Sequence, residues 1–274
     1  PILMAGLDVT EKALIMPEDF ERIRALGNPV SDIVAQWLEF FYKFHKSIGY
    51  EGAPMHDPCA VMALIHPEVF TIKPMHVEIE TQGEYCRGCT VGDQLGLSGK
   101  APNAQVLLDV DRKAFADRLD CDVGVDDAIA IMTAHALSEI DLLAISTVSG
   151  NAPLSATFPN AHRMNGLMKT HYPVYKGADR PLLVEPQYAA AFHGENGLGD
   201  VELPLPEDAV MNVTPAWDAL YDCAKQHPGE LRLIAVGPLT NVAIALTKYP
   251  DLKTLLHTIL IMGGAASGGN VTPA

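Results

Sequence analysis

Residues 120–137 read DCDVGVDDAIAIMTAHAL, four aspartates followed by an apolar segment with helical spacing. On an extended chain Asp120 and Asp122 point to the same side, and Gly124 permits a sharp turn. Asp126 and Asp127 then fall in the first turn of the helix that we expect from residue 126. A strand that ends in polar residues and leads into a helix is the repeating unit of parallel α/β sheets.

The chain after this stretch repeats the alternation of strand and helix. Short apolar segments without polar alternation predict buried strands at residues 141–150, 173–177, 231–237 and 258–264. Longer periodic segments predict helices at residues 153–170, near 214–226 and at 240–249. Because buried strands that alternate with helices form parallel sheets, we predict an α/β fold, a mostly parallel sheet with helices on both faces.

The residues before this stretch predict a mixture of helices and short strands. A strand is predicted at residues 2–7, and helices are predicted at 17–27, 31–49 and 57–67. Ser31 and Asp32 are candidates to cap the second helix. Residues 69–111 should form short strands joined by Gly and Pro turns, and the DxD pair of Asp109 and Asp111 should end a strand and cap the helix after it. No linker interrupts the chain, so we expect a single domain over residues 1–274.

Composition and charge narrow the class of protein. The chain is 48% hydrophobic and 19% charged, which is ordinary for a globular domain. Its net charge of −15 repels phosphate backbones and anionic lipids, so we expect neither nucleic acid nor a membrane as a partner. No apolar segment reaches membrane-spanning length. The five scattered cysteines argue against a disulfide framework and favour a reducing cytoplasm.

Cys86 and Cys89 form an isolated CxxC motif, CRGC. A structural zinc site usually needs a second cysteine pair or nearby histidines, and the sequence offers neither. We therefore expect a tight turn between two strands at this motif.

The aspartates of residues 120–127 concentrate more negative charge than one helix end stabilises. The helix dipole favours one or two carboxylates in the first turn, and not easily four. Crowded carboxylates share protons or bind a cation, and ligands that are all oxygen select a hard ion, calcium or magnesium. The alternative, a helix cap on a solvated acidic turn, stays open on these residues alone.

Other polar clusters follow predicted strands or begin predicted helices. They are HDPC (56–59), VSGN (148–151), AVGPLTN (235–241) and MGGAASGGN (262–270). Ligands of parallel α/β sheets bind beyond the carboxyl ends of the strands. We therefore expect these clusters to gather around one site.

DCDVGVDDAIAI resembles the DxDxGxDDAxA signature of the inosine–uridine-type nucleoside hydrolases. VSGN, HGENGLG (193–199), VGPLTN, LIMGGA (260–265) and HDPCAV (56–61) are also similar to blocks of that family, and together they span nearly the whole chain. The resemblance implies the family's Rossmann-like fold and hydrolysis of ribonucleosides to ribose and free base with bound Ca²⁺, an activity of purine and pyrimidine salvage. The context GAPMHDP (52–58) resembles the pyrimidine-preferring members.

The order of these blocks differs from the order in the family. Residues 1–119 resemble the family's carboxyl-terminal part and residues 120–274 its amino-terminal part, as in a circular permutation or in segments joined out of native order. The strand that carries Asp120 and Asp122 should then begin several apolar residues earlier, and the join near Leu119 shortens it. An AEFN-like block, which in the family holds the ribose 5′-hydroxyl, does not follow NVTPA (270–274).

The resemblance also implies roles for individual residues. By motif position, Asp122, Asp127 and Asp57 would ligate calcium together with the backbone carbonyl of Val236. Asp122 would also be the base for the attacking water. A calcium ion can orient the ribose diol and the water together, and negative charge around the ribosyl centre suits an oxocarbenium-like transition state.

The remaining roles concern the substrate. Contacts with the ribose or the base are implied for Asp126, Asn151, Asn270, Met262 and His193. Among these, Asp126, Asn151 and Asn270 would hydrogen-bond the ribose hydroxyls, whereas His193 would line the base pocket. His56 would protonate the leaving base. His45, His66, His135 and His257 are expected as core or surface residues.

Two alternatives compete with this interpretation. DCDVG also resembles the nucleophile loop of magnesium-dependent haloacid-dehalogenase-like phosphohydrolases, but no convincing lysine partner follows a predicted strand. A permuted or truncated chain could instead bind nucleosides without turnover, and the absent AEFN-like block supports that alternative. Members of the resembled family are commonly oligomers, so a homodimer or homotetramer is expected.

Overall fold

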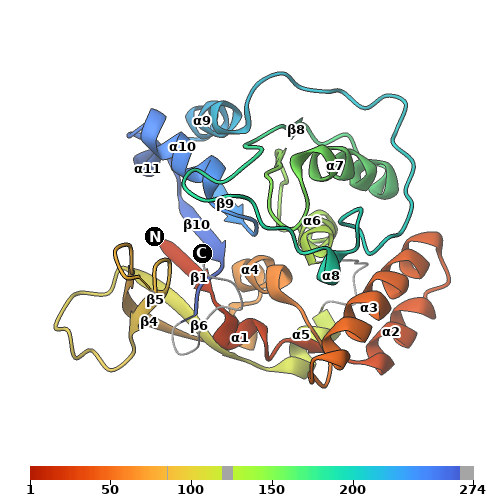
Figure 1. Cartoon of the computed structure of the whole chain (residues 1–274), viewed down its shortest axis with the longest axis horizontal. Coiled ribbons are helices and arrows are strands. Elements are labelled where there is room, and N and C mark those ends of the chain that lie inside the picture. Colours follow the sequence, from red (N-terminus) through yellow and green to blue (C-terminus); the bar gives the residue numbers. More distant parts are fainter. Residues whose placement is uncertain (85, 119–125, 266–274) are drawn as a thin grey trace.

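Six strands form the central sheet of the computed structural model, which describes residues 1–84, 86–118 and 126–265 (Figure 1). Four of them run parallel in the order β6 (Ala104–Val110), β1 (Ile2–Ala5), β10 (Thr258–Met262) and β9 (Arg232–Ala235). Beyond β6, the strands β4 (Phe70–Ile79) and β5 (Thr90–Asp93) add antiparallel pairs. The predicted mostly parallel sheet is confirmed.

Three of the residues singled out from the sequence, Asp120, Asp122 and Asn270, lie outside the described residues.

The parallel strands are covered on both faces because successive residues of a strand point in opposite directions. On β9, Ile234 packs into the main core cluster, to which α4 (His56–Ile65) also contributes. Its neighbour Leu233 packs instead with α9 (Ala216–Gln226), α10 (Thr240–Lys248) and α11 (Leu252–Leu255). Figure 1 shows α4 on one side of β1 and β10 and these three helices on the other.

The amino end of α3 (Pro29–Ser47) differs from the prediction. The Asn28 side-chain oxygen accepts hydrogen bonds from the backbone N–H groups of Val30 (3.0 Å) and Ser31 (2.9 Å). The assignment of the cap to Ser31 and Asp32 was therefore wrong. Pro29 explains the difference, because a proline lacks the N–H that would stay unpaired at the first helical position.

β4 is one continuous strand, whereas the sequence predicted two short strands on either side of Pro74. Only β6 pairs with β4 at Pro74, because pairing with β5 begins at His76. A proline removes one ladder hydrogen bond, so it is tolerated where the strand has a neighbour on one side only.

The strand predicted at residues 141–150 is only partly confirmed. Its paired part is β7 (Ile145–Ser146), which forms a separate parallel pair with β8 (Val174–Tyr175). A second small sheet joins β2 (Leu14–Ile15) to β3 (Ala53–Pro54) in antiparallel fashion. β7 and β9 therefore end two different sheets.

The other helices largely follow the periodicity of the sequence. They are α1 (Leu7–Thr10), α2 (Pro17–Arg24), α5 (Arg112–Arg118), α6 (Asp126–Ala136), α7 (Leu154–Met168), α8 (Ala190–His193) and the 3-10 helix η1 (Pro67–Val69). Of the predicted pair Asp109 and Asp111, Asp111 caps α5, since its carboxylate accepts from the backbone N–H of Ala114 at 3.0 Å. Helices of the described ranges are all too short or too polar to cross a membrane.

Replacing Phe115 with alanine should lower the free energy of unfolding by about 3–5 kcal/mol, the cost of truncating a buried phenylalanine. The Phe115 side chain on α5 is 0% exposed and meets Phe70 edge-to-face at 6.1 Å. Urea denaturation measures the change. Leu183→Ala is the control, because Leu183 is 95% exposed and its truncation should stay within about 0.5 kcal/mol. Equal small effects for both variants would contradict the packing of α5 on the core.

Candidate functional site

The amino ends of α4 and α6 meet at the carboxyl side of the sheet. The two helices pack through Val61 on α4 and Ala130 and Ala134 on α6. The carboxylate of Asp126, in the first turn of α6, accepts hydrogen bonds from the backbone N–H groups of His56 (3.2 Å) and Asp57 (3.4 Å) at the start of α4. His56 and Asp126, which are 70 positions apart in sequence, are thus joined. The amino ends of both helices carry positive partial charge, which attracts the Asp126 carboxylate.

Three carboxylates gather at this junction. Asp57 is 4% exposed and Asp126 is 5% exposed, and Asp127 lies beside them, since its charge acts on both. Burial raises the pKa of Asp57 well above its usual range, and the charges of Asp126 and Asp127 raise it further. The pKa of Asp126 is raised by burial and by Asp127, against the opposing effect of its two backbone hydrogen bonds. Such a cluster needs a proton or a cation to neutralise it.

Asn151 extends the cluster toward the loop after β7. Its side-chain N–H group donates to the Asp127 carboxylate at 3.1 Å, and its backbone carbonyl accepts from Ala189 at 2.9 Å. The side chain itself is exposed. Asn151 therefore presents an exposed amide beside the carboxylates, and its contact with ribose stays a prediction.

Histidines form the second half of the site. The rings of His45 and His56 are 6.4 Å apart, and His193 lies 5.8 Å from the ring of Phe41, which also contacts His45. Burial lowers the pKa of His56 to about 3, with further lowering from His45 and His193. Burial also lowers the pKa values of His45 and His193. The cluster is therefore neutral at physiological pH.

One fully buried histidine nitrogen of this cluster has no hydrogen-bond partner in the described part of the chain. Nδ1 of His193 is buried and makes no hydrogen bond to the described part of the chain. His193 lies at the end of α8. Burial lowers its pKa, and the negative charge of Asp127 offsets part of that effect. A buried nitrogen without a partner is a candidate for contact with a ligand.

Thr10 orients His56. The Thr10 hydroxyl hydrogen-bonds Nδ1 of His56 at 2.8 Å, and Thr10 is fully buried at the end of α1. Thr10 is not among the site residues predicted from the sequence. The available signal was its position in LDVT, a segment that directly follows the predicted strand at residues 2–7.

Thr10→Val should lower the free energy of unfolding by about 1–3 kcal/mol, because valine keeps the shape and leaves the buried His56 nitrogen without its partner. Thr10→Ser retains the hydroxyl and is the matched control. Urea denaturation of the three proteins measures the difference. Equal stability of the valine and serine variants would show that the hydrogen bond contributes nothing.

Val236 and Met262 lie at the ends of two neighbouring strands. Val236 directly follows β9, and Met262 is the last residue of β10. Both side chains are half-buried and pack against the main core cluster. No described contact joins either side chain to Asp57 or Asp126, so their roles remain predictions.

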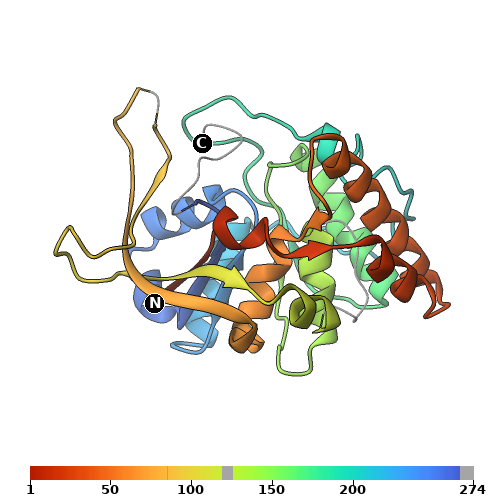
Figure 2. The same cartoon turned by 90° about the horizontal axis from the view of Figure 1, so that it is seen from below.

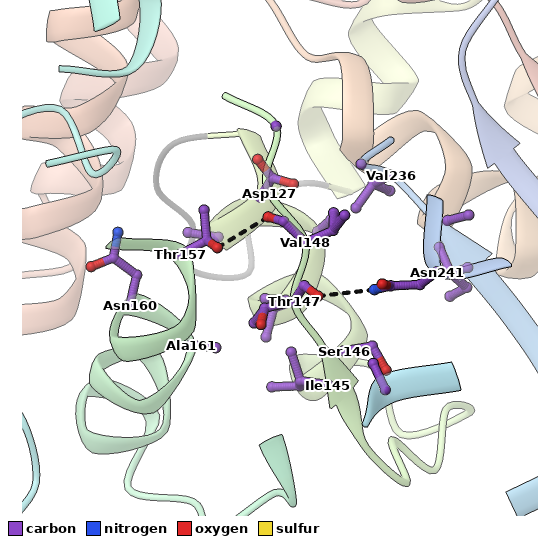
Figure 3. A pocket seen from close by; sticks show the side chains of 18 of the residues that line it. Asp127, Ile145, Ser146, Thr147, Val148, Thr157, Asn160, Ala161, Val236 and Asn241 are labelled. Atoms are coloured by element: carbon purple, nitrogen blue, oxygen red, sulfur yellow. Dashed lines mark hydrogen bonds between the residues drawn. The ribbon is translucent and has the colours of Figure 1, made fainter. Parts of the chain in front are cut away.

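A cavity of about 260 Å³ lies between β7 and β9. Figure 3 shows Ile145, Ser146, Thr147 and Val148 along one wall, with Asp127, Val236 and Asn241 among the other residues that line it. Asn151 also borders the cavity. The polar groups in the wall are largely engaged. The Thr157 hydroxyl donates to the Val148 carbonyl, and the Asn241 amide donates to the Thr147 carbonyl (Figure 3).

This cavity is smaller and more apolar than a typical ligand pocket, which spans about 300–1,000 Å³ and contains converging polar groups. In the described ranges, β7 pairs only with β8, and β9 pairs only with β10. The cavity is therefore a gap between two strand edges. The polar site is the cluster of carboxylates and histidines, of which only Asp127 borders the cavity.

Asp57 and Asp127 offer oxygen ligands, the donor type that hard cations such as calcium prefer. Within residues 1–84, 86–118 and 126–265, however, no three His, Cys, Asp or Glu side chains form a group that could hold a metal ion. Asp57 and Asp127 would complete a ligand set only with a further donor, for which Asp122 and the Val236 carbonyl were predicted. Asp122 lies outside the described residues.

Comparison with known proteins gives matches over both parts of the chain. The family model described as inosine-uridine preferring nucleoside hydrolase matches residues 1–117 and 118–274. A pyrimidine-specific ribonucleoside hydrolase, RihA, of Klebsiella pneumoniae strain 342 is 53% identical over 121 residues, which are 43% of this chain and 39% of the relative. RihA of Escherichia coli O17:K52:H18 is 54% identical over the same lengths.

Among solved structures, a plant nucleoside hydrolase, the PpNRh1 enzyme, aligns with a TM-score of 0.50 and 34% identity. The alignment covers 55% of this chain and 48% of that chain. The chain thus spans less than half the length of the relatives it matches.

Proposed function

This chain belongs to the inosine–uridine preferring nucleoside hydrolase family, and on that premise we propose that it hydrolyses the N-glycosidic bond of ribonucleosides to ribose and a free base. We propose a preference for pyrimidine nucleosides. The curated relatives that are 53% and 54% identical are named as pyrimidine-specific, which supports that preference.

The observation that carries the proposal is the junction of α4 and α6. Asp57, Asp126 and Asp127 come together there beside the neutral histidine His56. Negative charge favours an oxocarbenium-like ribosyl centre, and a neighbouring imidazole can hydrogen-bond the departing base. A haloacid-dehalogenase-like phosphohydrolase is not supported, because the family match covers both parts of the chain.

Calcium is the proposed cofactor. Asp57 and Asp127 would hold it with Asp122 and the Val236 carbonyl, all oxygen donors of the kind that calcium prefers. When bound, calcium would supply charge that favours deprotonation of a water and would orient the ribose diol. Burial and mutual repulsion raise the pKa values of Asp57 and Asp126, so their charged forms need a neutralising cation at this junction.

The protein's own groups would bind and orient the nucleoside. Asp122 is the proposed base for the water. The other proposed substrate contacts are those of Asp126, Asn151, Asn270, Met262 and His193. Asn151 is already fixed by Asp127, and Nδ1 of His193 is free of protein partners in the described part of the chain. His56 keeps one N–H in its neutral form, which can donate to the leaving base.

The deciding experiment is reducing-sugar release from uridine, cytidine, inosine and adenosine. We expect the protein to release ribose from each nucleoside that it hydrolyses, with the highest rates for uridine and cytidine. Faster release from inosine and adenosine would contradict the pyrimidine preference alone. No release from any nucleoside by a folded protein that still binds uridine would favour the binding-only alternative.

We also propose that residues 1–119 and 120–274 form one domain whose two parts stand in the reverse of the family order. The two matches of the family model meet between residues 117 and 118. In space β10 and β1 are neighbouring parallel strands, with Ile259 beside Ile2, as expected if β1 followed β10 along the sequence. The gap between the edges of β7 and β9 is lined by Ala128, Ala130 and Ile131 of α6, so a strand ahead of α6 would meet both edges there.

A rearranged chain tests this order. Residues 118–274 are placed before residues 1–117 through a Gly/Ser linker, and a six-residue apolar strand is added in front. A matched chain carries six Gly/Ser residues instead. We expect the apolar version to melt at least about 2–4 °C higher, the shift that 1 kcal/mol produces in a chain of this size. Equal melting temperatures would contradict the proposed strand.

The assembly and location are proposed from the same premise. A homodimer or homotetramer is supported by exposed apolar side chains at Ile79, Val91, Leu95 and Leu97, near the outer edge of the sheet. Light scattering after size exclusion measures the assembly. A cytoplasmic location is proposed from the free cysteines, Cys59, Cys86, Cys89 and Cys223.

A further inference from the structure

The CRGC motif forms the tight turn that the sequence predicted. The backbone N–H of Cys89 donates to the carbonyl of Cys86 at 2.9 Å, which closes a four-residue turn. Gly88 has a φ of +87°, a value that the third position of a type II turn requires and that glycine adopts without strain. The turn adjoins the ladder of His76–Ile79 with Thr90–Asp93, the part of β4 and β5 that projects from the body of the molecule in Figure 2.

This turn brings two thiols within bridging reach. The first and fourth Cα atoms of a β-turn lie within about 7 Å, and disulfides join cysteines whose Cα atoms are about 4.4–6.8 Å apart. Both Cys86 and Cys89 are exposed, whereas Cys59 is buried and Cys223 is half-buried. Among the described cysteines, only this pair combines closeness in sequence with access to solvent.

Further backbone hydrogen bonds hold the turn in place. The N–H of Glu80 donates to the Cys89 carbonyl at 2.9 Å, and the N–H of Gly88 donates to the Glu80 carbonyl at 2.6 Å. Beside the turn, Thr90 pairs with Ile79 in the β4–β5 ladder and lies against Gly264, which follows β10. The cysteine backbones are therefore held near each other before any bond forms.

We propose that Cys86 and Cys89 are a dithiol site that reacts with small disulfides to form a reversible intramolecular disulfide. A thiolate of one cysteine attacks the small disulfide, forms a mixed disulfide and releases one small thiol. The second thiolate then attacks the protein sulfur of that mixed disulfide and releases the other small thiol. The two cysteines lose two protons and two electrons in total, and the small disulfide gains them.

The site is separate from the carboxylate and histidine cluster, so its test is independent of nucleoside hydrolysis. The full chain is incubated with hydroxyethyl disulfide, a neutral probe, and remaining thiols are alkylated after denaturation. Trypsin then cleaves after Arg87, which stands between the two cysteines. We expect the fragment that ends at Arg87 and the fragment that begins at Gly88 to stay linked until a reductant is added.

Variants in which one cysteine is replaced by serine test whether both thiols take part in the reaction. Cys86→Ser and Cys89→Ser should each accumulate the mixed disulfide, because the second thiol that resolves it is absent. Cys223→Ser is the matched control and should form the linked fragments as the parent chain does. Separate fragments in the parent chain, or stable mixed disulfides on Cys86 or Cys89 there, would overturn the proposal.

Discussion

Asp57→Asn should reduce kcat/KM for ribose release by more than about 100-fold, beyond the 10–100-fold loss typical of groups that only support a metal ligand. Asp57 is buried at the start of α4, beside Asp126 and Asp127. Asparagine has nearly the same shape but carries no charge, so it removes a proposed calcium ligand and leaves the packing of α4 in place. Initial rates of ribose release from uridine measure the loss.

The matched control for this variant is Asp141→Asn, which removes the same charge at an exposed position away from the junction. It should keep the parent rate. Melting temperatures of both variants establish that the chains are folded. Parent-like ribose release by folded Asp57→Asn would remove Asp57 from the proposed site.

Removal of calcium should abolish ribose release, and added calcium should restore it. Calcium accepts six to eight oxygen ligands in flexible geometry, whereas magnesium demands a smaller octahedral site, so magnesium should restore less activity. The measurement is the rate of ribose release after treatment with a chelator and dialysis, followed by titration with each ion. Full activity in the presence of chelator would contradict the proposed cofactor.

Thermal stability gives a second readout of the same site that does not depend on turnover. A ligand that binds only the folded chain stabilises it by about 2.7 kcal/mol at 100 times its Kd. We therefore expect calcium to raise the melting temperature of the parent chain and to raise that of Asp57→Asn less. An equal shift in both proteins would indicate that calcium binds elsewhere.

Local patterns of the sequence were sufficient for most elements of the fold. The apolar segment at residues 258–264 contains β10, because a strand buried on both faces is apolar throughout. The periodic segment at residues 153–170 contains α7, because the side chains of a helix return to the same face about every 3.6 residues. The predicted strands were wrong where pairing with a neighbouring strand decides how far a strand extends. β4 continues through Pro74 because only β6 pairs with it there, and β7 is short because only Ile145 and Ser146 pair with β8 in the described part of the chain.

The sequence by itself determined the α/β class, the family of the chain, and which polar blocks belong together. Those features depend on residue types and spacings that are written along the chain. Only the tertiary structure decided that Asp126 caps the start of α4, that Thr10 binds His56, and that His45 lies beside them. These contacts join residues tens of positions apart, and burial at their junction lowers the pKa of His56 and raises the pKa of Asp57. Burial depends on packing between distant segments, so no local pattern specifies it.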